Sequence, residues 1–306
     1  MQKYLRLYNL PLEELIEMSS KITKENFNNE VEFCSIISAK TGKCKENCKY
    51  CSQSAHNKAK IEVHDLLPTE EVRKAAISAR DNGATRFCIV TSGTKPEKRD
   101  FDKIIEMIKA VTQIDGLHTC CSLGILDEEQ VKAIKEAGIE RYNHNINTAK
   151  SYHDSICTTH SFEDRIRTIK LIQKYGIEAC AGVIIGMGET REQRIEMALQ
   201  LAELSPESVP VNFLNPIEGT PLEGTEDAIS EEEILRTICI FRIILPGALL
   251  RYAGGRTTRL SKDYQKLGIK AGINALLAGN YLTTTGSYAA EDVKMLEKEG
   301  LCVSKA

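Results

Sequence analysis

The sequence lacks the features that mark membrane, secreted and nucleic-acid-binding proteins. It has no run of about 18 apolar residues, which a membrane-spanning helix needs, and no block of five or six basic residues. The N-terminal segment MQKYLRLYNLPLEELIEMSS interrupts its apolar residues with Glu, Lys and Pro. It therefore predicts an amphipathic helix and not a signal peptide. We expect a cytoplasmic protein without a nucleic-acid or membrane partner.

Short apolar segments alternate with longer amphipathic ones along nearly the whole chain. The segments that begin at 69, 127 and 161 have helical periodicity, open on Thr, Asp or Ser and close on Gly. Eight strands in alternation with helices predict an α/β fold of the (β/α)₈ TIM-barrel type. The predicted strands are 31–37, 86–90, 117–123, 141–146, 178–185, 209–214, 248–254 and 271–277.

The chain also lacks a linker rich in Gly, Pro or Ser, a low-complexity stretch and a short repeat. Its 306 residues, with 27% charged and 42% hydrophobic, have an ordinary globular composition. We therefore expect one domain over 1–306. It would comprise an N-terminal helical segment (1–30), the barrel (31–280) and a C-terminal tail or helix (281–306).

Cysteine, in contrast, is abundant, with eleven residues. In a reducing compartment this number points to metal ligation or catalysis and not to disulfides. Five of the eleven are most simply interpreted as small buried apolar residues or incidental thiols. They are Cys34, Cys121, Cys157, Cys239 and Cys302.

Three cysteines are closely spaced directly after the first predicted strand, at Cys44, Cys48 and Cys51. This spacing places three thiolates on one loop, where they could hold three corners of a [4Fe-4S] cluster. The fourth iron would then lack a protein ligand and could activate a small molecule, much as a catalytic zinc keeps one position open. The alternative is a zinc site, for which His56 is the nearby candidate as fourth ligand.

Three further cysteines, Cys88, Cys120 and Cys180, lie inside predicted strands. Because alternate residues of a barrel strand face the lumen, these thiols could converge there. Taken singly, each is as typical of a core cysteine as of a ligand. Arg251 lies among apolar residues of a later strand, and a buried arginine needs a partner. Alternatively, Arg251 lies at the barrel mouth and pairs with a carboxylate of a bound ligand.

Amide side chains gather at the end of the fourth predicted strand, at Asn143, Asn145 and Asn147, and Asn212 lies in the sixth. The C-terminal ends of barrel strands carry catalytic loops. An amide both donates and accepts hydrogen bonds without charge, which suits ribose hydroxyls and ureido groups. Local turn chemistry would explain the same residues.

The chain resembles the biotin synthase family of radical S-adenosylmethionine (SAM) enzymes. The cysteine loop, with Tyr50 before its last cysteine, matches the radical SAM signature. Further matches are TRFCIV, CCSLG, YNHNINT, GVIIGMGET, SVPVNFLNPIEGTPL and LLRYAGGR. The resemblance implies that the loop holds a [4Fe-4S] cluster whose open iron binds SAM. It also implies a [2Fe-2S] cluster held by Cys88, Cys120, Cys180 and Arg251.

The resemblance assigns further residues to the two small molecules. SAM would contact Tyr50, Asn145, Asn147, Gly182, Ile184 and Glu189, and the substrate would contact Asn143, Asn145 and Asn212. The position of Asn147 is often Asp in the family, so a charge-assisted hydrogen bond is absent here. The glycine-glycine-glutamate motif of many radical SAM enzymes is replaced by TSGTK (91–95). Thr91 and Ser92 could serve the methionine end of SAM.

The implied reaction is sulfur transfer that converts dethiobiotin to biotin. A 5′-deoxyadenosyl radical would abstract hydrogen from dethiobiotin, and the [2Fe-2S] cluster would supply the sulfur. Family members are typically homodimers and take electrons from flavodoxin- or ferredoxin-type proteins. Two alternatives remain from the sequence. A radical SAM relative of the hydrogenase-maturase or aminomutase kind would not need the strand cysteines with Arg251, and a non-enzymatic iron–sulfur carrier would not need a SAM pocket.

Overall fold

The computed structural model describes residues 1–225, 229–279 and 289–306. In these ranges parallel strands form a closed barrel, because β1 pairs with both β2 and β9. The strands are β1 (Glu30–Lys40), β2 (Arg86–Thr91), β3 (His118–Ser122), β4 (Arg141–Asn143), β5 (Glu178–Cys180), β6 (Val183–Ile185), β7 (Ser208–Phe213), β8 (Leu249–Tyr252), β9 (Ala275–Leu277) and β10 (Cys302–Val303).

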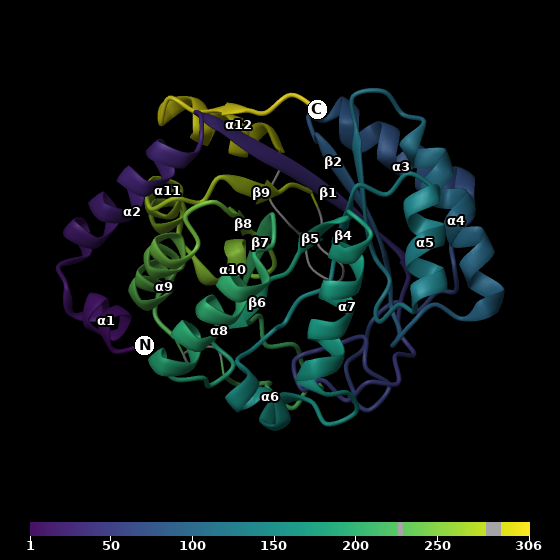
Figure 1. Cartoon of the computed structure of the whole chain (residues 1–306), viewed down its shortest axis with the longest axis horizontal. Coiled ribbons are helices and arrows are strands. Elements are labelled where there is room, and N and C mark those ends of the chain that lie inside the picture. The colour runs from purple at the N-terminus through teal and green to yellow at the C-terminus, as the bar shows by residue number, and fades with distance from the viewer. Residues whose placement is uncertain (226–228, 280–288) are drawn as a thin grey trace.

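Helices surround the ring of strands (Figure 1). Figure 1 shows α3, α4 and α5 on one side of the barrel and α2, α9 and α11 on the other. The helices are α1 (Gln2–Leu5), α2 (Leu12–Asn26), α3 (Thr69–Asp81), α4 (Lys98–Thr112), α5 (Glu128–Glu136), α6 (Lys150–Ile156), α7 (Phe162–Lys174), α8 (Arg191–Leu204), α9 (Glu231–Ile244), α10 (Arg256–Arg259), α11 (Lys262–Lys270) and α12 (Ala289–Lys298), with a 3₁₀ helix, η1, at Arg6–Asn9.

The predicted TIM-type barrel is confirmed, with one interruption. The expected strand 178–185 is divided into β5 and β6. A Cβ atom on Gly182, which lies between them, would approach the carbonyl oxygen of Pro210 on β7 to 2.1 Å. The backbones of the two strands thus come closer here than any side chain allows, and the regular ladder stops.

Local sequence signals position several of the helix ends. Asp127 and Ser161 each accept a hydrogen bond from the backbone three residues later, and both form complete capping boxes. Gly138 and Gly176 follow α5 and α7 with positive φ, as expected for the residue after a helix. At the start of α3 the cap is Pro68, so Thr69 is the first helical residue and not the predicted cap.

The side chains of each strand divide between two environments, as strand alternation requires. Outward-facing residues such as Ile89 and Cys121 pack with Ile104 and Met107 of α4 in the main apolar core. Inward-facing residues such as Cys88 belong to a separate buried group in the lumen. The fold therefore presents a thiol-rich lumen inside an apolar shell.

The chain ends lie against the outside of the barrel. α2 packs on α9, and the hydroxyl oxygens of Tyr8 and Thr237 are 3.1 Å apart. Of the expected C-terminal segment 281–306, residues 281–288 lie outside the described residues. α12 follows them, and β10 pairs with the start of β1 through Glu30 and Cys302. No helix in the described ranges is long and apolar enough to cross a membrane.

Candidate active site

Two cavities adjoin inside the barrel, near the C-terminal ends of its strands. The outer cavity, of about 220 Å³, is lined by the cysteine loop and the ends of β2, β3 and β4. The inner cavity, of about 350 Å³, extends into the lumen. Six residues line both cavities: Tyr50, Val90, Ser122, Asn143, Asn145 and Asn147.

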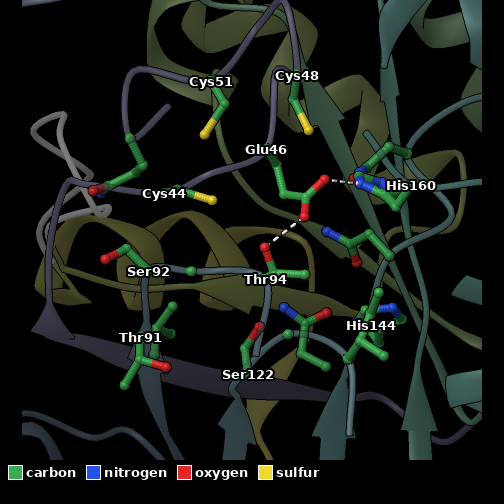
Figure 2. Close-up of a pocket in the computed structure, with 18 of the residues that line it drawn as sticks. Cys44, Glu46, Cys48, Cys51, Thr91, Ser92, Thr94, Ser122, His144 and His160 are labelled. Atoms are coloured by element: carbon green, nitrogen blue, oxygen red, sulfur yellow. Dashed lines mark hydrogen bonds and ion pairs between the residues drawn. The ribbon is translucent and has the colours of Figure 1, made fainter. Parts of the chain in front are cut away.

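The predicted loop cysteines lie together at the outer cavity. Figure 2 shows the sulfur atoms of Cys44, Cys48 and Cys51 pointing toward a common space, with Ser122 and His144 opposite them. The side-chain amide of Asn57 donates to the carbonyl oxygens of Cys48 at 3.1 Å and Cys51 at 2.8 Å, which fixes the loop. Burial raises the pKa of the Cys51 thiol to about 11. The thiol is therefore protonated at neutral pH until a metal displaces the proton.

The sequence suggested His56 as a further metal ligand beside the loop, but other residues lie next to Cys48. His56 Nε2 is hydrogen-bonded to the carbonyl oxygen of Lys45 at 3.0 Å on the exposed side. Cys157, which was assigned no role, has its sulfur 3.6 Å from that of Cys48, and His160 lies beside it. The two thiols are 109 residues apart, so loop spacing gives no sign of the contact.

The predicted convergence of the strand cysteines is confirmed. Cys88, Cys120 and Cys180 all line the inner cavity, and Cys88 is the direct register partner of Cys120. Cys34, which the sequence analysis had set aside, lines the same cavity from β1. Strand alternation could have found Cys34, because it lies two residues before Ile36, the register partner of Cys88.

Arg251 also lines the inner cavity, but its partner belongs to the protein. Its guanidinium forms an ion pair with Glu32 on β1 and lies 3.3 Å from the Ser208 hydroxyl. Glu32 also contacts Arg141 at 2.7 Å and Arg86 at 3.2 Å. Burial alone would raise the pKa of Glu32, but the charges of the three arginines outweigh it and lower this pKa to about 2. The alternative of Arg251 at the mouth, awaiting a ligand carboxylate, is therefore wrong.

The asparagines after β4 lie where the two cavities join. Asn145 accepts a hydrogen bond from the Gly182 amide at 2.9 Å. Asn147 has a left-handed backbone, and its side-chain oxygen accepts from the Tyr50 hydroxyl at 2.6 Å and from Arg165 at 3.1 and 3.2 Å. Arg165 lines the outer cavity from α7, a residue that the sequence analysis did not single out.

Two polar atoms at this junction are buried without a hydrogen-bond partner among the described residues: Asn143 Oδ1 and His144 Nε2. Burial lowers the pKa of His144 well below its ordinary value, so its ring is neutral. Unpaired buried polar atoms are costly. These two atoms are therefore suited to a polar ligand. Thr91 and Ser92, which the sequence suggested for the methionine end of SAM, line the outer cavity nearby.

The other predicted site residues mostly shape the backbone around the inner cavity. Asn212 lines the inner cavity, but its amide donates to Val183 O at 3.0 Å and accepts from Gly254 N at 2.9 Å. Glu189 lines neither cavity; it accepts from the Gly186 amide at 2.8 Å and shapes the turn after β6. Gly182 provides the close strand contact, whereas Ile184 lines the inner cavity.

Known protein families match both halves of the chain. Residues 39–201 match the Radical SAM superfamily, and residues 210–302 match the Biotin and Thiamin Synthesis associated domain. The chain is 45% identical over 289 residues to the biotin synthase of Acetivibrio thermocellus, with 94% of this chain and 89% of that protein covered. It is 42% identical to the biotin synthase of Campylobacter hominis, with 98% and 92% covered. The chain belongs to the biotin synthase family.

Solved structures support the fold of this biotin synthase family member. A methylornithine synthase superimposes with a TM-score of 0.84 at 23% identity, covering 99% of this chain and 93% of that one. An [FeFe]-hydrogenase maturase gives a TM-score of 0.81 at 18% identity, covering 97% and 70%. These proteins share the barrel, whereas the much higher identity to biotin synthases decides the family.

Proposed function

We propose that the protein is a sulfurtransferase that converts dethiobiotin to biotin by radical SAM chemistry. One observation carries the proposal: two sets of cysteines face two adjoining cavities of one barrel. A substrate at the junction would lie between both sets. Of the six residues of the shared wall, all but Val90 have a polar side chain, and none of them is charged.

The loop fits a [4Fe-4S] cluster with one open iron. Cys44, Cys48 and Cys51 face one space, and amide, hydroxyl and imidazole groups surround it on the other sides. When bound, this cluster and SAM supply a 5′-deoxyadenosyl radical, and a second cluster supplies the sulfur. Tyr50, Asn145 and Asn147 are placed to bind and orient SAM at the junction, and the closed barrel excludes water from the reacting carbon.

The lumen fits the second, sulfur-donating cluster. Cys88, Cys120 and Cys180 would hold it, with Arg251 beside them, and Cys34 adds a fourth thiol to the same wall. Arg251 Nε is buried without a partner among the described residues, so it points to an additional acceptor. The arginine charge offsets that of the thiolates, which lowers the cost of burying them.

The remaining assignments complete the proposal. Asn143 would contact the ureido group of dethiobiotin, because its side-chain oxygen is buried and unpaired within the described residues. Asn212 and Glu189 would act indirectly, by holding the backbone around the pocket. We further propose a cytoplasmic homodimer, one domain over 1–306, and electron delivery by a flavodoxin- or ferredoxin-type protein.

Isotopic transfer of sulfur tests the proposal. Protein reconstituted anaerobically with iron and labelled sulfide should form biotin from dethiobiotin, SAM and a reductant, with the label in its first turnover. The Cys180→Ala variant should keep the loop cluster and still cleave some SAM, but form no biotin. Unlabelled biotin from the labelled protein would refute the cluster as sulfur source. SAM cleavage without any biotin in the unmodified protein would favour a maturase-like activity.

A further inference from the structure

The segment after α6 is fastened to the cysteine loop by several hydrogen bonds. The backbone amide of Lys49 donates to Ile156 O at 3.0 Å, and that of Asn47 donates to the Thr159 hydroxyl at 3.1 Å. The side chain of Asn47 also donates to the Thr158 hydroxyl at 2.7 Å and accepts from the Thr158 amide at 2.9 Å. The backbone therefore fixes the position of Cys157 against the loop.

This attachment brings together metal-ligating atoms that no motif connects. The sulfur atoms of Cys48 and Cys157 are 3.6 Å apart, and the Cys157 sulfur lies 3.4 Å from His160 Nδ1. The three ligand atoms all lie within 4.8 Å of one another. Two sulfurs on one tetrahedral ion are about 3.8 Å apart when each bond is about 2.3 Å. The observed spacing thus fits ligands of a single ion.

A carboxylate lies beside the histidine of this group. Glu46 Oε2 is 2.5 Å from His160 Nδ1, and Glu46 Oε1 accepts from the Thr94 hydroxyl at 2.5 Å (Figure 2). His160 is buried, and its Nε2 has no hydrogen-bond partner among the described residues. Two thiols and an imidazole form a donor set typical of divalent iron, cobalt or zinc, and the Glu46 carboxylate adjoins the imidazole.

We propose that Cys48, Cys157 and His160 bind one thiophilic divalent metal ion in the protein without its clusters, next to the Glu46 carboxylate that contacts His160. Binding displaces the proton that Cys48 donates to Cys157 and the proton shared between His160 and Glu46. Cys157 does not line the outer cavity, whereas Cys48, Glu46 and His160 do, so this site borders that cavity and shares Cys48 with the proposed [4Fe-4S] cluster. The ion and the cluster would therefore exclude each other.

Cobalt(II) titration of the cluster-free protein tests the site, under anaerobic conditions with a phosphine reductant. One equivalent of bound cobalt, with the thiolate charge-transfer and intense visible bands of a tetrahedral ion, should depend on Cys157, separately from any cobalt held by the thiols of the inner cavity. Cys157→Ser, which keeps the size and hydrogen bonding of this side chain, should weaken binding at least tenfold. Cys51→Ala is the matched control and should bind cobalt as the unmodified protein does.

Two results would overturn the site. One is unchanged cobalt affinity in Cys157→Ser. The other is loss of cobalt binding in Cys51→Ala, which would assign the ion to the loop cysteines alone. Circular dichroism of each variant checks folding. His160→Gln should also weaken cobalt binding, and it serves as the test if the variant at Cys157 fails to fold. The titration uses neither SAM nor dethiobiotin, so its outcome is separate from the proposed sulfur transfer.

Discussion

Replacing Glu32 by Gln should destabilise the cluster-free protein more than any exposed substitution on the same strand. Glu32 is largely buried, with 12% of its side chain exposed, and contacts three arginines, at Arg86, Arg141 and Arg251. Gln keeps the shape of the side chain but leaves three positive charges close together without their carboxylate. Removing one partner of a buried ion pair is costly because the other charge stays desolvated.

The size of the effect follows from the carboxyl pKa. Its fall from the ordinary 4.5 to about 2 corresponds to about 3 kcal/mol in favour of the folded, ionised form. This contribution is fully present above the unfolded-state pKa and is lost as the pH falls toward the folded-state pKa. The free energy of unfolding of the unmodified protein should therefore decline between pH 4.5 and 2 by more than that of the Gln variant.

Urea unfolding at pH 7 measures the difference. Glu32→Gln should lower the free energy of unfolding by about 3 kcal/mol, whereas Glu30→Gln, exposed at the start of β1, should change it by less than about 0.5 kcal/mol. A loss below about 1 kcal/mol in the Glu32 variant, or an equal pH dependence of both proteins, would refute the reasoning. After reconstitution the loss should shrink, since cluster thiolates would supply negative charge beside Arg251.

Substitutions at three further residues test the site and the barrel around it. Cys51→Ala should reduce 5′-deoxyadenosine formation to background, because it removes one of three loop ligands; undiminished product would contradict the loop's role. Asn147→Asp should keep SAM affinity, since Tyr50 and Arg165 can donate to either side chain, whereas Asn147→Leu should cost about 1–3 kcal/mol of binding. Equal affinities in titration calorimetry would place Asn147 outside the pocket. Gly182→Ala should destabilise the fold by about 2 kcal/mol or more, because the added methyl group overpacks against β7. An unchanged midpoint of urea unfolding would contradict this and show that β7 can move aside at no cost.

Patterns confined to one segment of the sequence predicted the structure well. The alternation of strands and helices predicted the barrel, and strand parity correctly separated Cys120, which faces the lumen, from Cys121, which faces the core. Capping preferences predicted the starts of α5 and α7. Each of these signals depends on neighbours within a few residues, so the chain itself displays them.

Contacts between distant segments could not be predicted in this way. Arg251 and Glu32 are 219 residues apart, and nothing near Arg251 in the sequence indicates a carboxylate partner. The break between β5 and β6 results from a contact of Gly182 with Pro210, which only the closed barrel creates. The approach of Cys157 to Cys48 likewise depends on how α6 packs beneath the loop.

The spread of the luminal ligands along the chain has a consequence for how the protein is made. The loop thiols are all present once residue 51 has been synthesised, whereas the inner site also needs Cys180 and Arg251 and is enclosed only when β9 (Ala275–Leu277) pairs with β1. Chains emerge from the ribosome N-terminus first, and closure between distant segments is slow. The loop can therefore capture iron on a nascent chain. The inner site, in contrast, can receive its iron and sulfide only when synthesis is nearly complete. Iron starvation late in synthesis should leave molecules with iron bound at the loop cysteines and no cluster at the inner cavity.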